Sequence, residues 1–459
     1  MIKKIGKNFF ALTISTILII SLVACGGNGD TADPVVADEN GEAVEDVVDE
    51  TTEDGNNDEV ETISGDLSGS LSVQIWDTNQ LAGIEEIVAA FSAETGVDVS
   101  VSVVSGDEYW TRIEAGIAGG DVVDIFWMHS NEAQRYMENG ILLDLTDHIT
   151  NSEKVDLDRF PDDIRELYVY EGRIYSMPKD IDTIALWYNR TLFEEAGIDT
   201  PNETWTWDHF YEVAVALTDP EAGIWGTAMN PGNDQDGWMN IIYSMGGYVI
   251  NEDRTASGFD NPNTIAAMEF VDDLIRNAMP ATETMAETYA HVLFQSGTVA
   301  MVTQGSWMLS GFLQNEYLVE NANVAVLPMD ANTGRRVSIY NGLGWAANVE
   351  TENPEAAKAL IEWFSTEEMQ LKQARLGVTM SAFEGTSDAW ANRTDVFNLN
   401  AHLEMLEDTV IRPYSRNSFE WLRPLWDTLR EAWAENITME EACLQIAEQM
   451  NGVLVAEQQ

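Results

Sequence analysis

Beyond residue 70 the chain changes repeatedly between the two-residue period of a strand and the longer period of a helix. Residues 71–76 (LSVQIW) and 97–104 (VDVSVSVV) are predicted to be strands, because apolar and polar side chains alternate along them. Residues 83–96 instead repeat apolar side chains three and four positions apart and end at Gly96, which suits the left-handed C-cap of a helix. The pattern therefore predicts a strand, a helix and a second strand.

A third strand is predicted at residues 122–128 (VVDIFWM), after a second helix at residues 107–118. The run is almost continuously apolar, which is typical of a strand buried in a parallel sheet. Open α/β sheets bind ligands outside the carboxyl ends of their strands, so we expect ligand contacts at residues 76–80 and 127–131. This part of the chain is therefore predicted to form a βαβαβ lobe.

Residues 170–189 (YEGRIYSMPKDIDTIALWYN) are the stretch around which the chain is organised. Pro178 interrupts it, charged side chains follow, and a β-rich apolar run completes it. We interpret it as an extended crossover between two lobes, on which the carboxylate of Asp182 accepts hydrogen bonds from a ligand held between them. The alternative is that Asp182 caps a turn after Pro178, and this stretch favours neither interpretation.

Later helices have recognisable ends. Asn353 with Pro354 is typical of a helix start, and so are the capping boxes of Ser365 with Glu368 and of Thr438 with Glu441. Gly377 is predicted to end the second of these three helices. No internal repeat is found, which argues against a cell-surface adhesin.

The N-terminus has the features of a signal peptide. Lysines at positions 3, 4 and 7 precede an apolar run over residues 9–24, which is too short to span a membrane as a helix. Leu-Val-Ala before Cys25 resembles a bacterial lipobox, so we predict that residues 1–24 are a lipoprotein signal peptide and that Cys25 carries lipid. The alternative is an ordinary signal peptide followed by an incidental cysteine.

Acidic residues dominate the charge of the chain, which is −56 overall. Residues 25–66 contain fifteen acidic side chains and no lysine, arginine or aromatic residue, so residues 25–69 are predicted to be a disordered, self-repelling tether. The net charge argues against nucleic acid or an anionic lipid surface as a partner. It also suggests a saline or alkaline exterior.

Cysteine, histidine and nucleotide-binding motifs exclude several kinds of chemistry. If Cys25 carries lipid, Cys443 has no intrachain disulfide partner and is expected to be a buried apolar residue. The five histidines show no metal-ligand spacing; His129 is expected in a surface loop, with a place at the cleft mouth as the alternative. The chain has no phosphate-binding loop motif, so any ATPase is a separate chain. We predict neither a metal nor a cofactor.

Fifteen tryptophans are present, and several stand at predicted strand ends or loops beside Asp, Asn or Gln. Flat aromatic faces suit the C–H side of a sugar ring, and planar carboxylate and amide groups suit its hydroxyls. Since aromatic residues are more often core residues, each tryptophan has packing as its alternative role. Four that lie in helical patterns are expected to pack: Trp363, Trp390, Trp426 and Trp433.

The order of several motifs resembles the family 1 extracellular solute-binding proteins of ABC importers, the group that includes maltose-binding protein. The matching stretches are GRIYSMP followed by WYNRTLFEEAGIDTPNETWTW (residues 187–207), FQSGTVAMVTQGSW (294–307), GGDVVDIFWMH (119–129) and GWAANVETENPEAAKALIEWF (344–364). The likeness extends over roughly residues 70–454.

The resemblance implies an α/β, two-lobe, periplasmic-binding-protein-like (type II) fold with a ligand cleft between the lobes, which close like a hinged trap. The expected boundaries are residues 70–181 plus about 334–380 for lobe 1, and residues 182–333 plus about 381–459 for lobe 2. It also implies capture of a solute and delivery to a membrane permease, without catalysis.

Several residues match ligand-binding positions of the family. Asp182 stands where maltose-binding protein has a Glu, and Trp307 matches a Trp that stacks on a sugar ring. Ser130 and Asn131 replace an Asp and an Arg, which argues against maltose itself. The full predicted ligand-binding set is Trp76, Asp77, Gln80, Trp127, Ser130, Asn131, Asp182, Trp238, Trp307 and Trp345.

The sequence therefore predicts a monomeric, lipid-anchored carbohydrate-binding protein of an ABC importer. A cationic ligand such as a polyamine is the alternative within binding proteins, suggested by the acidity and by Asp77, Asp124 and Asp182. A secreted glycoside hydrolase is the alternative from another class, because paired carboxylates and tryptophan platforms also suit that chemistry. No carboxylate pair is marked by its spacing, which argues against the hydrolase.

Overall fold

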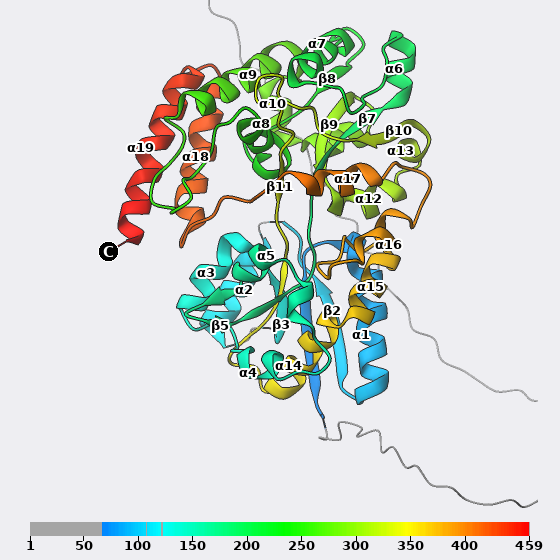
Figure 1. Cartoon of the computed structure of the whole chain (residues 1–459), viewed down its shortest axis with the longest axis vertical. Helices are drawn as coiled ribbons and strands as arrows, with labels where there is room; N and C mark the ends of the chain where they lie inside the picture. Colours follow the sequence, from blue (N-terminus) through cyan, green and yellow to red (C-terminus); the bar gives the residue numbers. More distant parts are fainter. Residues whose placement is uncertain (1–66, 107, 121–122, 459) are drawn as a thin grey trace, which may run out of the picture. The chain divides into compact units, whose positions relative to one another are not determined.

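The computed structural model describes residues 67–106, 108–120 and 123–458 (Figure 1). The predicted signal peptide, Cys25 and most of the predicted acidic tether lie outside these residues. The described residues form helices and strands grouped around two main sheets, each of which is the centre of one lobe.

The first sheet has five strands in the order β2-β1-β3-β12-β6. β1 pairs in parallel with β2 and β3, whereas β12 pairs antiparallel with β3 and β6. The strand bounds are β1 (Ser70–Ile75), β2 (Asp98–Val103), β3 (Ile125–Met128), β6 (Ser176–Pro178) and β12 (Gly344–Ala347). The three predicted strands of the first lobe are thus confirmed, with ends shifted by one to three residues.

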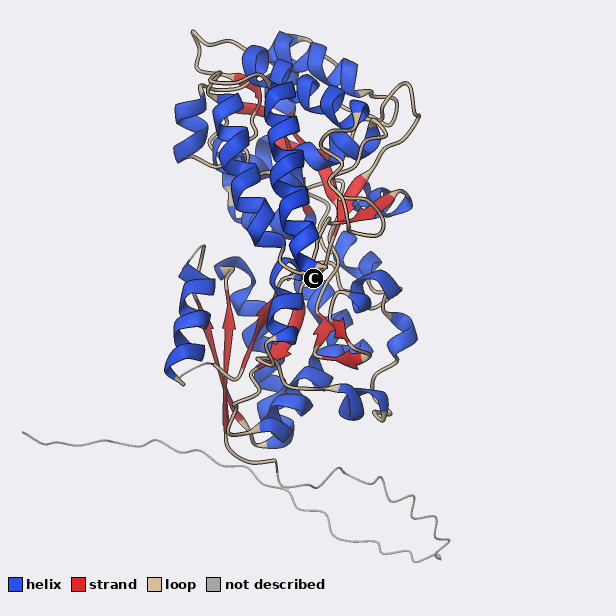
Figure 2. Cartoon of the chain, turned by 90° about the vertical axis from the view of Figure 1, so that its left-hand side faces the viewer, coloured by secondary structure: helices blue, strands red, loops and turns tan. Residues whose placement is uncertain are grey.

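Helices lie beside the strands of this sheet (Figure 2). α1 contacts α14 and α15, and α14 contacts β6 and β12. Gly96 caps α1 with φ 78°, as its place in the sequence predicts. The elements are η1 (Thr78–Gln80), α1 (Leu81–Thr95), α2 (Glu108–Gly119), α3 (Ser130–Glu138), α4 (Thr146–Thr150), η2 (Leu157–Arg159), α5 (Asp162–Glu166), β4 (Val169–Tyr170), β5 (Arg173–Ile174), α14 (Pro354–Ser365) and α15 (Glu367–Leu376).

The second sheet has four strands in the order β10-β7-β9-β8. β7 pairs antiparallel with both β10 and β9, and β8 pairs in parallel with β9. Every residue of β7 and β9 is buried, which matches the largely apolar composition of both strands; the polar exceptions are Asn189, Thr303 and Gln304. The bounds are β7 (Ile184–Asn189), β8 (Trp225–Thr227), β9 (Val299–Gly305) and β10 (Ala322–Ala325).

Most of the remaining helices surround this second sheet or extend beside it, and α18 and α19 pack against each other. In chain order the elements are α6 (Arg190–Ala196), α7 (Trp207–Leu217), η3 (Asp234–Trp238), α8 (Met239–Ser244), α9 (Pro262–Ala278), α10 (Thr282–Glu287), α11 (Ala290–Gln295), η4 (Ser306–Met308), α12 (Leu309–Gln314), α13 (Glu316–Asn321), α16 (Ser387–Ala391), α17 (Asn400–Glu404), η5 (Met405–Glu407), α18 (Ser418–Trp433) and α19 (Met439–Glu457).

Extended segments connect the two sheets. Residues 179–183 lead from β6 in the first sheet to β7 in the second, which confirms the predicted crossover. β11 (Ser338–Tyr340) and β13 (Thr409–Ile411) form a separate two-stranded parallel sheet. The residues that follow β11 and the crossover lie side by side, because Asp182 and Asn341 form a β-bridge. These segments bring residues distant in sequence to one place.

The helix ends test the predicted caps. The capping box of Thr438 and Glu441 is present, and Pro354 is the first residue of α14. The predicted capping box at Ser365 is wrong. Ser365 is the last residue of α14 and donates its hydroxyl to the carbonyl of Ile361 at 2.7 Å, so Thr366 caps α15 instead. α14 is one residue longer than predicted, so the cap of α15 lies at Thr366 instead of Ser365.

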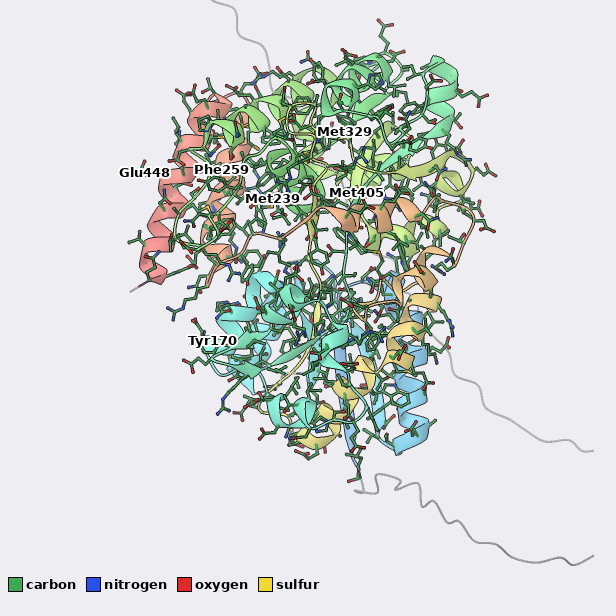
Figure 3. All side chains as sticks on the ribbon, viewed as in Figure 1. Tyr170, Met239, Phe259, Met329, Met405 and Glu448 are labelled. Atoms are coloured by element: carbon green, nitrogen blue, oxygen red, sulfur yellow. The ribbon has the colours of Figure 1, made fainter. Side chains whose placement is uncertain are left out.

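Large aromatic side chains fill the interior. Trp187 lies between Phe312 and Phe397, with ring centroids 4.8 and 5.0 Å away. In the second lobe Trp238 meets the edge of Phe259, which Figure 3 labels, at 6.0 Å. Cys443 is buried and unpaired, as its apolar setting predicts. Within the described residues, no helix combines the length and apolar character needed to cross a bilayer.

Candidate ligand-binding site

Asp182 lies on the crossover, where it is partly buried and faces the segment that follows β11. Its Oδ1 accepts hydrogen bonds from the backbone N–H of Asn341 (3.0 Å) and from Nε2 of Gln235 (2.7 Å). Burial, followed by the negative charge of Asp180, raises the pKa of Asp182 well above its usual value. Among the described residues Oδ1 accepts both of these hydrogen bonds, so Oδ2 is available to another donor.

A second carboxylate, Asp236, lies in the π-helical turn η3. Gly237 interrupts this turn with non-helical backbone angles (φ −134°, ψ −111°). Asp236 accepts hydrogen bonds from Nδ2 of Asn233 at 3.0 Å and from Nε2 of Gln304 at 2.7 Å. Burial raises the pKa of Asp236 to about 6. Because both side-chain donors are neutral amides, the ionised carboxylate retains a negative charge that these bonds do not cancel.

Three buried polar atoms near these groups have no hydrogen-bond partner among the described residues: Nε of Arg412, Oδ1 of Asn341 and Oδ1 of Asn131. Nη1 of Arg412 and Nδ2 of Asn341 lie 3.5 and 3.4 Å from Nε2 of His129. The N–H of Asn131 donates to Nδ1 of the same histidine at 3.1 Å. Since buried polar atoms are nearly always satisfied, these three atoms mark a place where the described residues leave bonding capacity unused.

Partly buried tryptophans provide flat apolar surface. Trp76 follows β1 and meets Tyr109 and Trp127 edge-on, with centroid distances of 4.9 and 5.0 Å. Its ring lies 6.3 Å from that of Trp110 on α2. These contacts fix Trp76 in one orientation while leaving part of it accessible.

Trp307 lies on the second lobe, directly after β9, and is also partly buried. Its ring packs on the backbone at Gly305, where an added Cβ would come within 2.0 Å of Cζ3 of the ring. A side chain at this position would displace the indole, so glycine is required for the close approach. The sequence Gly-Ser-Trp thus sets the position of the ring.

A cavity of about 480 Å³ lies where α2, α3 and the start of α18 meet. Its size falls in the range of small-molecule sites. The lining combines aromatic and hydrogen-bonding side chains, among them Trp110, Asn131, Glu132, Phe419, Arg423 and Trp426. The three residues from α18 are spaced by four and three positions and therefore share one face of the helix. We call this space the α3–α18 cavity.

No group of three or more His, Cys, Asp or Glu side chains in the described residues is arranged to hold a metal ion. The site offers instead carboxylate and amide acceptors, amide and guanidinium donors, and aromatic faces. This set of groups suits noncovalent recognition of a molecule with many hydroxyls.

The family of bacterial extracellular solute-binding proteins matches residues 76–371, which is more than half of the chain. The chain belongs to this family. Members of the family bind solutes outside the cytoplasm, so the expected general role and the extracellular setting follow from membership.

Relatives agree with this assignment. The solute-binding protein is 26% identical over 317 residues to a maltotriose-binding protein of Pyrococcus abyssi, an alignment that covers 67% of this chain and 65% of the relative. It is 23% identical over 325 residues to an arabinooligosaccharide-binding protein of Halalkalibacterium halodurans, covering 67% and 70% of the two chains.

Among solved structures, an ABC substrate-binding protein of Listeria monocytogenes in complex with cycloalternan superposes with a TM-score of 0.78. It is 21% identical and the match covers 84% of this chain and 99% of that chain. At this identity the likeness establishes the fold, and it confirms the predicted two-lobe α/β architecture.

The structure of this solute-binding protein separates its predicted site residues into two groups. Trp76, Asp182 and Trp307 are partly exposed, and Asn131 lines the α3–α18 cavity. Asp77 caps η1 and accepts Nε2 of Gln80 at 2.9 Å. These residues fall in different lobes and on the crossover, at the positions that the strand ends indicate.

The second group is buried, which argues against direct ligand contact in this structure. Trp127, Trp238 and Trp345 have no exposed surface, and Ser130 is only 2% exposed. Trp238 donates Nε1 to the carbonyl of Pro231 at 3.1 Å. Gln80 is buried as well, and its Oε1 accepts from Nζ of Lys179 at 2.9 Å. These five side chains pack beneath the partly exposed site residues or belong to the core.

Several residues of the site were not predicted. Trp426 was expected to pack, yet it lines the α3–α18 cavity together with Trp110. His129 was expected in a surface loop, but it is partly buried and caps α3. Arg412 and Asp236 gave no distinguishing signal, although Asp236 lies in a Gly-, Asn- and Asp-rich stretch that indicates a turn.

Proposed function

We propose that this protein captures a sugar or an oligosaccharide outside the cell and delivers it to the permease of an ABC importer. The observation that carries the proposal is the α3–α18 cavity with its aromatic, amide and charged lining, which includes Asn131, whose buried Oδ1 has no partner among the described residues. Aromatic faces suit sugar rings and unsatisfied donors and acceptors suit hydroxyls. The maltotriose- and arabinooligosaccharide-binding relatives support the same ligand class.

The proposal assigns separate roles to the parts of the site. Trp76, Trp110, Trp307 and Trp426 provide apolar faces, while Asp182, Asn131 and Asp236 accept hydrogen bonds from hydroxyls. In this proposal the protein is a monomer and not an enzyme, and a lipid on Cys25 anchors it to the outer face of the cell membrane. Replacement of Cys25 by serine should release the protein into the medium, which fractionation of cells would measure.

A cationic ligand such as a polyamine is the second candidate, and one observation favours it. Asp182 and Asp236 receive side-chain hydrogen bonds only from neutral amides within the described residues. An ammonium group would satisfy both carboxylates. Binding through such charges weakens with salt, whereas binding of a neutral sugar does not.

A thermal-shift screen of the full chain in detergent against mono-, di- and oligosaccharides tests the proposal, with polyamines and amino acids as controls. A ligand that binds only the native state stabilises it by about 2.7 kcal/mol at a hundred times its dissociation constant. A shift with one class of sugar, unchanged between low and high salt, is the expected result. A shift with polyamines alone, lost in salt, would replace the sugar by a cation. Release of shortened products from an oligosaccharide would make the protein a hydrolase.

A further inference from the structure

Arg412, directly after β13, forms a buried ion pair that the ligand-binding role does not by itself explain. Its Nη2 donates to both carboxylate oxygens of Asp234, at 2.8 and 2.9 Å. The two side chains are 7% and 4% exposed. A buried pair of this kind adds little stability compared with apolar side chains of the same size, so its retention points to a role other than stability.

The pair is connected to Asp182 through Gln235. Oδ1 of Asp234 accepts the backbone N–H of Gln235 at 2.5 Å, which fixes the start of the turn η3. The side chain of Gln235 then donates Nε2 to Oδ1 of Asp182 at 2.7 Å. Asp234 thereby determines where this amide lies, and the amide occupies one oxygen of Asp182.

A second set of contacts leads from Arg412 to Asp182 through the first lobe. Nη1 of Arg412 is 3.5 Å from Nε2 of His129, and Nδ2 of Asn341 is 3.4 Å from the same atom. The backbone N–H of Asn341 donates to Oδ1 of Asp182 at 3.0 Å. We call these six neighbouring residues the cleft ring: His129, Asp182, Asp234, Gln235, Asn341 and Arg412. Because Nδ1 of His129 accepts the N–H of Asn131, a neutral His129 carries its proton on Nε2, so its contacts with Arg412 and Asn341 are close approaches and not hydrogen bonds that it accepts.

We propose that Arg412 is a positioning residue for the ligand-binding carboxylate of Asp182. Through Asp234 and Gln235 it directs one of the two neutral donors to Oδ1 and leaves Oδ2 to accept from the ligand. This inference rests on the proposed function, because it assumes that Asp182 accepts a ligand hydroxyl. The cleft ring joins His129, which follows β3 of the first sheet, and the turn η3, which contacts β9 of the second sheet, with the connecting segments, so Arg412 also aligns Asp182 with respect to both lobes.

The charged groups around Asp182 also support a positioning role for Arg412. The titratable groups that face Asp182 are Asp180 on its own segment, Tyr168 after α5, Tyr340 on β11 and Arg412. Asp180 raises the pKa of Asp182 and Arg412 lowers it. Since Arg412 is the cation of this set, it favours the ionised carboxylate, which is a stronger acceptor for a hydroxyl than the protonated acid.

The test replaces both members of the buried pair, because removing Arg412 alone would leave Asp234 unpaired and destabilise the protein. The double variant Arg412→Met with Asp234→Leu keeps an apolar pair of similar volume. The control is Arg335→Met with Asp408→Leu, which removes an Arg–Asp pair that is 42% and 36% exposed, just before β13 and outside the cleft ring. Its contacts are Nη2 to Oδ1 at 2.7 Å and Nε to Oδ2 at 3.1 Å.

Two readouts are measured on the full chain. The pKa of Asp182 is followed by carbon-detected NMR of labelled aspartates without ligand, with Asp182→Asn for assignment. The dissociation constant for maltotriose, or for the sugar that gives the largest thermal shift, is measured by calorimetry. The double variant should raise the pKa of Asp182 further and weaken sugar binding tenfold or more, while the control pair changes neither.

An unchanged pKa of Asp182 together with wild-type affinity would overturn the proposal. If no sugar shifts the wild-type protein, the proposed function fails, and the NMR readout alone still shows whether Arg412 acts on Asp182. Should the double variant not fold, Arg412→Lys carries the test, since an ammonium keeps the charge but lacks the planar guanidinium that bonds Asp234. Wild-type affinity in that variant would also overturn the proposal.

Discussion

The crossover carries two aspartates two positions apart, and their surroundings differ. Oδ2 of Asp180 lies 2.5 Å from Nζ of Lys179, and its Oδ1 accepts the N–H of Leu343 at 2.7 Å. Lys179 is fully buried, also donates to Gln80, and lies 4.4 Å from the ring centre of Trp127. Asp180 is therefore fully bonded and adjacent to a cation.

Asp182 is only partly buried and receives neutral donors on one oxygen. The comparison shows how one short segment serves two purposes. Its first part, centred on Lys179 and Asp180, fastens the crossover to the first lobe through a satisfied ion pair. Its second part retains an acceptor with spare bonding capacity, which is what a ligand site needs. The first region should therefore govern stability and the second should govern affinity.

The largest expected effect is on the first region. Lys179→Met removes one partner of a buried ion pair and leaves Asp180 charged, so the free energy of unfolding should fall by about 3 to 5 kcal/mol. Chemical denaturation followed by tryptophan fluorescence measures it. The control Lys372→Met breaks an exposed pair with Glu86 at 3.2 Å and should cost less than about 1 kcal/mol. Equal losses in the two variants would contradict the distinction.

Asp182→Asn should have the next largest effect, and on affinity. If the carboxylate accepts from ligand hydroxyls, the substitution costs about 1.5 to 3 kcal/mol of binding free energy, because a charged acceptor becomes a neutral amide. Stability should change little. Asp156→Asn is the control, since Asp156 caps the turn η2 through the N–H of Asp158 at 3.2 Å. Loss of stability without loss of affinity would support the turn-cap interpretation of Asp182 instead.

Local chemistry explains what the sequence predicted correctly. The strands around residues 71–76 and 122–128, the cap at Gly96 and the capping box of Thr438 all depend on neighbours within a few positions. The crossover was also recognisable, because punctuation by Pro178 and a β-rich run are local features. Asp182 could therefore be placed on the crossover from sequence.

Long-range pairing explains what was missed. β12 inserts beside β3 with Trp345 directly opposite Trp127, and the two rings lie 6.0 Å apart. Trp345 also stacks on Phe364 at 4.1 Å, so both tryptophans become core residues. The ion pair of Arg412 and Asp234 joins positions 178 residues apart. No pattern within one chain segment encodes such contacts, and the same holds for the face of α18 that carries Trp426.

A smaller loss of affinity should follow from the aromatic part of the second region. Trp307→Ala removes a stacking face worth about 1 kcal/mol in addition to its buried area, so sugar binding should weaken about tenfold or more. Trp307→Phe should recover part of the loss. Tyr289→Ala is the control, since Tyr289 is 65% exposed and stacks on His291 instead. Wild-type affinity in Trp307→Ala would remove this residue from the site.

The smallest effect is a pH dependence with opposite signs for binding and stability. The pKa of Asp236 is raised to about 6, so the folded state holds this proton more tightly than the unfolded state. Its contribution to stability is therefore present below about pH 4 and is lost as the pH rises through 6. A ligand hydroxyl bonds more strongly to the ionised carboxylate, so affinity should instead fall by up to about tenfold between pH 7 and pH 5. Asp236→Asn should flatten both profiles, as measured by calorimetry and thermal unfolding across that range.

A wild-type affinity that is constant with pH would show that the ligand does not bond to this carboxylate, and would confine binding to Asp182 and the aromatic faces.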